Sequence, residues 1–168
     1  FVVNELSRLG SNFRKNEDLN DYLVRNHIPG IQGIDTRALT KLLRNDGCMN
    51  GMITTHKYEV SEVIDKIKAF KVQGVVKACT CKEKYTVGTG RMKVALYDFG
   101  AKRNIANELA KRNCEVTVFP ATTPASEVLE GNFDGIMLSN GPGDPAEVTD
   151  IIAEVKKLSE SGMPIFAI

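Results

Sequence analysis

From Met92 to the last residue, short apolar runs alternate with amphipathic stretches at close spacing. The pattern predicts four strands, over residues 93–97, 115–119, 135–139 and 165–168. Helices are predicted between them, over residues 101–112, 124–129 and 145–161. Elements that alternate with connections this short form a parallel sheet with right-handed crossovers and helices on both faces. We therefore predict an α/β fold for this half of the chain.

The third predicted strand runs into a loop rich in glycine and proline. Residues 136–145 read IMLSNGPGDP, with two glycines and two prolines in the last six positions. Glycine leaves backbone N–H groups uncovered by a Cβ and lets a ligand approach closely. Open α/β sheets bind ligands at the carboxyl ends of their strands, where this loop is predicted to lie. Asp144 and Pro145 then suit the N-cap and first position of a following helix. The alternative is a strand-to-helix turn that only needs glycine.

A second loop of chemical interest follows the first predicted strand. Residues 98–104 read DFGAKRN and place a charged cluster at the start of a helix. If the first and third strands are neighbours, this loop and the glycine loop share one crevice. The alternative for Asp98 is a helix cap, and for Lys102 a solvated side chain.

The first half of the chain has a different organisation. Helices are predicted over residues 16–26 and 36–46, the second between an Asp35 cap and Gly47, and a third begins after a Ser61 cap. Residues 72–78 have strand composition, and residues 79–91 are polar. We therefore predict a domain over residues 1–82, a linker over 83–91 and a second domain over 92–168.

Composition excludes several classes of function. The net charge is +1 with no long charged run, which gives no indication of nucleic-acid or membrane binding. The four cysteines follow no disulfide or zinc spacing, so no metal site is expected and reduced thiols in the cytoplasm are the favoured interpretation. The chain opens without methionine and closes on a strand pattern, which leads us to expect an internal fragment lacking both ends.

Several segments together resemble the small chain of glutamine-hydrolysing carbamoyl-phosphate synthase. They are SNFR at 11–14, GIDTRALT at 33–40, YDFGAKRNI at 97–105 and LSNGPGDP at 138–145. The resemblance covers most of the chain and is weakest over residues 55–91. It implies the C-terminal part of the small-chain-specific α/β domain, followed by the first half of a flavodoxin-like class I glutamine amidotransferase domain with a parallel sheet.

The resemblance also implies an activity. The family's small chain is a glutaminase that uses a Cys-His-Glu constellation to release glutamate and ammonia from L-glutamine. The ammonia passes to a large subunit, which uses ATP, magnesium and bicarbonate to make carbamoyl phosphate for pyrimidine and arginine synthesis. It implies a cytoplasmic heterodimer and no cofactor in the small subunit itself.

Matched residue by residue, the resemblance assigns the glutamine and oxyanion contacts to Gly141 and Gly143. It assigns Asp98, Lys102 and Asn104 a supporting role at the border of the same pocket. In the family the nucleophilic cysteine follows the strand that ends here at Ile168. We therefore expect no catalytic residue among the 168 and an inactive fragment.

Two other functions remain open at this stage. A flavodoxin-like module could bind a nucleotide or phosphate through Asp98 and the glycine loop, without amidotransferase activity. Such a module should carry an acidic cluster at the end of the first strand, where Asp98 stands alone. A catalytically silent relative, with the nucleophile replaced, would leave a synthase that depends on free ammonia.

Overall fold

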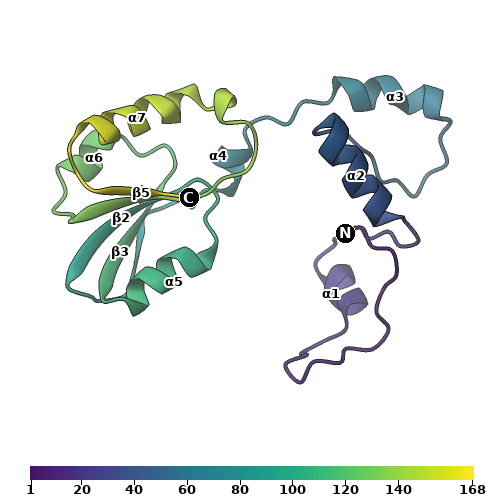
Figure 1. The fold of residues 1–168 in the computed structure, drawn as a ribbon, viewed down its shortest axis with the longest axis horizontal. Helices are drawn as coiled ribbons and strands as arrows, with labels where there is room; N and C mark the ends of the chain where they lie inside the picture. Colours follow the sequence, from purple (N-terminus) through teal and green to yellow (C-terminus); the bar gives the residue numbers. More distant parts are fainter. The chain divides into compact units, whose positions relative to one another are not determined.

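The computed structural model describes residues 1–168, which divide into two compact units, Phe1–Phe70 and Lys71–Ile168. Figure 1 shows their elements in chain order. The division falls earlier than the predicted linker, because residues 83–91 lie inside the second unit. None of the helices is both long enough and apolar enough to cross a membrane.

The first unit contains the helices α1 (Leu19–Arg25), α2 (Thr36–Asp46) and α3 (Val60–Ala69). Both predicted ends of α2 are confirmed. The Asp35 carboxylate accepts the Ala38 N–H at 2.9 Å. Gly47 follows the helix with φ of 87°, a conformation that side chains with a Cβ rarely adopt. Local capping chemistry was therefore sufficient to place this helix.

The predicted start of α3 at Ser61 is wrong, because Glu59 is the N-cap. The Glu62 carboxylate accepts the Glu59 N–H at 3.1 Å, which gives the reciprocal geometry of a capping box. A glutamate three residues after the cap thus offsets the lack of a short hydroxyl side chain at the cap itself.

The first unit has no buried helical residue. Its chain start is held by a parallel bridge between Val2 and Ile31. Val3 N–H donates to the Ile31 carbonyl at 3.0 Å, and Ile31 N–H donates to the Phe1 carbonyl at 2.8 Å. Backbone hydrogen bonds therefore hold the chain start to the segment around Ile31, and the helices of this unit bury no side chain.

The second unit is built on a five-stranded sheet. Its strands are β1 (Tyr85–Val87), β2 (Met92–Asp98), β3 (Cys114–Pro120), β4 (Gly135–Leu138) and β5 (Ile165–Ala167). They lie in the order β1-β3-β2-β4-β5. β1 is antiparallel to β3, and every other neighbouring pair is parallel. The predicted α/β fold with a parallel sheet is confirmed.

Helices cover both faces of this sheet. They are α4 (Val75–Cys79), α5 (Arg103–Lys111), α6 (Ala125–Leu129) and α7 (Thr149–Glu160), together with the 3₁₀ helix η1 (Pro145–Glu147). In Figure 1, α6 and α7 lie on one side of the sheet and α5 on the other. Tyr97 packs in the core on the α6–α7 side and its neighbour Leu96 in the core on the α5 side, as strand periodicity requires.

The strand predicted over residues 72–78 is wrong, because Val75–Cys79 form α4. Gly74, in the left-handed region with φ of 66°, precedes the helix. Val76 is buried in a cluster with Ala121 and Ile151. Valine-rich composition favours a strand, but burial of one helical side chain against distant residues decides the outcome here.

The predicted linker contains a strand. Within residues 83–91, β1 pairs with β3, so that Tyr85 lies opposite Val118 and Val87 opposite Val116. A strand of only three residues carries little periodic signal of its own. Its formation depends on the edge of β3, which lies far along the sequence.

Three predicted helices are clearly shorter in the structure, and the first of them, predicted over residues 16–26, is α1 (Leu19–Arg25). The helix predicted over residues 145–161 divides at Val148 into η1 and α7. Asp144 caps η1 as expected, and its carboxylate accepts the Ala146 N–H at 2.9 Å. The helix predicted from residue 101 begins at Arg103, because Gly100, with φ of 117°, forms part of a turn that precedes it.

Candidate functional site

The two loops singled out in the sequence lie together at the carboxyl ends of neighbouring strands. β2 and β4 are parallel neighbours, with Tyr97 opposite Leu138. The shared crevice was predicted if the first and third predicted strands were neighbours, and these strands, β2 and β4, are neighbours. Phe99 lies in the first loop and Ser139 at the start of the second. The Phe99 N–H donates to the Ser139 hydroxyl at 2.9 Å.

A cavity of about 400 Å³ opens beside the glycine loop. Residues 139–145 form one wall, and Phe99, Val76 and one face of α7 form others. Ile168 also lines it, and its N–H donates to the Leu138 carbonyl at 3.2 Å. The cavity thus lies where the ends of β4 and β5 meet, as ligand sites of open α/β sheets do.

Glycine is required at position 141 because the Phe99 backbone approaches it closely, and not because of its φ. Gly141 is absent from the glycines with positive φ. A Cβ at this position would lie 2.7 Å from the Phe99 carbonyl oxygen and 3.0 Å from the Phe99 Cβ. Any side chain at 141 would therefore push the two loops apart.

Glycine is required at position 143 because of its backbone conformation, and not because of a close neighbour. Its φ is +84°, which residues with a Cβ rarely adopt. A Cβ would meet only the Val75 side chain, at an ordinary 3.8 Å. The N–H groups of Gly141 and Gly143 have no acceptor within the chain, so both remain able to donate to a ligand in the cavity.

Asp98 organises its loop and leaves little capacity for a ligand. Its buried carboxylate accepts the N–H groups of Cys81, Gly100 and Ala101 at 2.8, 2.9 and 2.6 Å. It does not cap α5, whose N-cap is Lys102. A carboxylate committed to three backbone donors is a structural anchor for the turn.

Cys81 is poorly suited to act as a nucleophile. Burial, and next the neighbouring Asp98 carboxylate, raise the pKa of the Cys81 thiol above its ordinary value. Because the thiolate is the reactive form, a raised pKa lowers reactivity. No cysteine lines the cavity beside the glycine loop. No group of three or more His, Cys, Asp or Glu side chains is placed to hold a metal ion.

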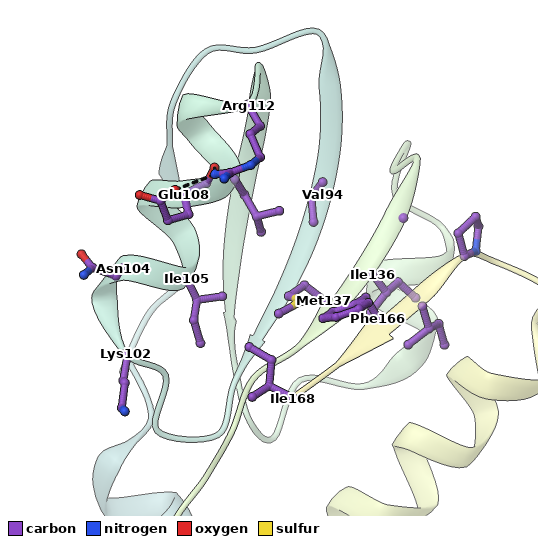
Figure 2. Close-up of a pocket in the computed structure, with 14 residues that line it drawn as sticks. Val94, Lys102, Asn104, Ile105, Glu108, Arg112, Ile136, Met137, Phe166 and Ile168 are labelled. Carbon is purple, nitrogen blue, oxygen red and sulfur yellow. Dashed lines mark hydrogen bonds and ion pairs between the residues drawn. The ribbon is translucent and has the colours of Figure 1, made fainter.

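Lys102 and Asn104 do not line the cavity beside the glycine loop, in contrast to the expectation from the sequence. They line another cavity, of about 660 Å³, on the α5 side of the sheet, and Ile168 is the one residue that lines both cavities (Figure 2). Its other walls include apolar residues such as Ile105 and Phe166. The turn at Gly100 carries the chain toward α5, which separates these two side chains from Phe99.

Sequence reasoning missed one hydroxyl residue of the site, Ser139, and one structural hydroxyl outside the cavity, Thr80. Ser139 was assigned only to the end of a strand, yet its side chain connects the two loops. Thr80 fell in a polar stretch, yet its hydroxyl accepts the Ala121 N–H at 2.8 Å. For Ser139 the signal available was a hydroxyl between a buried strand and a glycine loop. Nothing in the sequence marks Thr80.

Comparison with known proteins matches both parts of the chain to families. Residues 95–168 match "Glutamine amidotransferase class-I". Residues 1–53 match "Carbamoyl-phosphate synthase small chain, CPSase domain".

Several curated proteins are similar over nearly the whole chain, and each is described as a carbamoyl phosphate synthase small chain. The Clostridium perfringens protein is 45% identical over 94% of this chain and 45% of its own length. The Syntrophotalea carbinolica protein is 42% identical over 100% of this chain and 49% of its own length. The Salmonella typhimurium protein is 42% identical over 99% of this chain and 49% of its own length. The chain thus spans about half the length of these relatives.

Proposed function

Because the chain belongs to the carbamoyl-phosphate synthase small-chain family, we propose that it supplies the glutamine-binding loop of a glutaminase. The enzyme hydrolyses L-glutamine to glutamate and ammonia and delivers the ammonia to a large subunit. The observation that carries the proposal is the pair of uncommitted N–H groups, on Gly141 and Gly143, beside a cavity at the end of β4.

The reaction explains why backbone donors are needed here. A thiolate attacks the side-chain amide carbon of glutamine, and negative charge develops on the amide oxygen. The Gly141 N–H stabilises that oxyanion, and the amide nitrogen takes a proton from the histidine of the family's Cys-His-Glu constellation and leaves as ammonia. Water then hydrolyses the thioester to glutamate and the free thiol. A backbone donor held in place needs no reorganisation as the charge forms, which makes such donors effective in catalysis.

None of the cysteines among these 168 residues lies at the position of the family's nucleophile. The family's cysteine follows the position of Ile168, and in this chain Ile168 is hydrogen-bonded to the end of β4 and lines the cavity. A thiolate in the next position would start close to the glycine loop. We assign no nucleophilic role to Cys48, Cys79, Cys81 or Cys114.

The partner and pathway belong to the same proposal. The large subunit uses ATP and magnesium to convert bicarbonate and ammonia to carbamoyl phosphate, which feeds arginine and pyrimidine synthesis in the cytoplasm. The small chain itself needs no cofactor. A phosphate-binding module without amidotransferase activity is not favoured, because the Asp98 carboxylate is committed to three backbone N–H groups.

The test compares two proteins in an ammonia-release assay with glutamine. A small chain of full family length that contains this sequence, assembled with its large subunit, should release ammonia and form carbamoyl phosphate. The 168-residue chain alone should release none above the buffer control, because a covalent mechanism without its nucleophile loses the chemical step itself. Ammonia release by the 168-residue chain, or none by the full-length complex, would contradict the proposal.

A further inference from the structure

The Ser139 side chain connects the two loops of the site through a directed pair of hydrogen bonds. Its hydroxyl accepts the Phe99 N–H at 2.9 Å and donates to the Asn140 carbonyl at 2.7 Å. The residue is 5% exposed, and its own N–H donates to the Tyr97 carbonyl at 3.2 Å. A hydroxyl has a single proton, so accepting from Phe99 leaves that proton for Asn140.

Fixing the Asn140 carbonyl also fixes the next N–H group. The peptide bond is planar, and no peptide bond in this chain is cis. In a trans peptide the carbonyl of Asn140 and the N–H of Gly141 point in opposite directions. The hydroxyl that holds the carbonyl therefore sets the direction of the Gly141 N–H.

The other end of the connection is itself held in place. Phe99 follows Asp98, whose carboxylate accepts the N–H groups of Gly100 and Ala101. The Phe99 carbonyl lies so close to Gly141 that a Cβ could not be accommodated. Ser139 is therefore anchored to a turn with little freedom to follow the glycine loop.

Without this connection the peptide between Asn140 and Gly141 has few restraints. Glycine populates both signs of φ readily, so a peptide unit before it rotates at low cost. The Gly141 N–H has no acceptor in the chain that would hold it. We propose that Ser139 is a positioning residue, which orients the Gly141 N–H toward the oxyanion through the Asn140 carbonyl. The proposal rests on the function proposed above.

The first test is structural and uses the 168-residue chain. Ser139→Ala removes the hydroxyl, and NMR then follows the Gly141 amide. We expect the NOE between the Gly141 amide proton and the Asn140 Hα to change, or the order parameter of the amide to fall from about 0.85 toward 0.6. If the NOE and the order parameter both keep their wild-type values, Ser139 does not position this peptide and the inference fails.

The matched control is Thr80→Val. It also removes one hydroxyl that accepts a backbone N–H, at 2.8 Å from Ala121, but Thr80 makes no contact with the glycine loop through that bond. This variant should lose stability while the Gly141 signals stay unchanged. A change of the Gly141 signals equal to that in Ser139→Ala would show a general loss of packing and overturn the inference.

The second test is kinetic and uses the full-length small chain with its large subunit. Ser139→Ala should lower kcat with glutamine by about 10-fold or more, up to the 10²–10³ expected when one oxyanion donor is lost. KM and the ammonia-dependent rate should change little, because the N–H acts in the transition state. An unchanged kcat would refute the catalytic consequence. A wild-type complex inactive with glutamine would instead refute the proposed function, whereas the NMR result would still decide the positioning.

Discussion

Replacing Gly141 with alanine tests whether the close contact between the two loops matters for catalysis. The added Cβ would lie 2.7 Å from the Phe99 carbonyl oxygen. Ordinary contacts between carbon and oxygen are about 3.3–3.6 Å long. The glycine loop must therefore move away from Phe99 by about 0.6 Å or more, because the nearest atom is a backbone oxygen that no side-chain rotation can move aside.

This displacement is large compared with the tolerance of an oxyanion donor. Such donors act when they lie within about 2.7–3.1 Å of the oxyanion, a window narrower than the expected shift. We expect kcat with glutamine to fall by about 10²-fold, which corresponds to about 2.7 kcal/mol of transition-state stabilisation. Because Gly141 does not have positive φ, the loss comes from displacement and not from a strained backbone.

The assay measures carbamoyl phosphate formation by the full-length complex, first with glutamine and then with ammonium chloride as the nitrogen source. The large subunit needs only ammonia, so the second rate should be close to that of the wild type. Gly90→Ala serves as the matched control, because its Cβ would collide with the Asn113 backbone at the opposite end of β2. That variant should lower thermal stability, and both rates should fall together as folded protein is lost.

One result would refute the reasoning directly. A Gly141→Ala protein that melts like the wild type and keeps its glutamine-dependent kcat would show that the loop is only a strand-to-helix turn. A parallel fall of both rates, as expected for the Gly90 variant, would show that Gly141 serves the stability of the fold instead.

Two further predictions concern titratable side chains of the second unit. Burial and the Asp98 carboxylate raise the pKa of the Cys81 thiol, so alkylation at pH ~8 should modify Cys81 more slowly than the exposed Cys48. Peptide mass spectrometry would measure both rates, and equal rates would contradict this prediction. Burial, and next the carboxylates of Glu154 and Glu127, raise the pKa of Tyr97 to about 12 from an ordinary 10.0. The folded state then retains a proton that the unfolded state loses, so this contribution to the free energy of unfolding should decrease as pH rises from about 10 to 12. The tyrosinate absorbance should include a component that titrates near 12 and is lost in Tyr97→Phe, whereas Tyr85, whose pKa burial also raises, stays in both proteins.

The sequence by itself determined the elements whose causes are local. The Asp35 cap, the Gly47 terminus and the amphipathic repeat between them define α2 without help from distant residues. The four parallel strands were predicted because each carries a buried apolar run bounded by turn residues. Their alternation with helices then restricted the topology, since parallel strands need crossover connections.

The tertiary structure decided the elements that depend on distant partners. Residues 75–79 are helical because Val76 fits between Ala121 and Ile151. β1 exists because β3 offers it an unpaired edge. Neither cause is visible in the local pattern, and in both segments the composition favoured another structure.

The candidate site divides in the same way. The glycine loop could be found from the sequence, because glycine and proline directly after an apolar run indicate that the strand ends there in a loop. Only the position of the Phe99 carbonyl shows that Gly141 must lack a Cβ. Only the tertiary structure shows that Lys102 lines another cavity. The hydrogen bond from Phe99 to Ser139 joins residues 40 positions apart. Contacts of this kind depend on the pairing of β2 with β4 in the sheet, which the local sequence preferences do not determine.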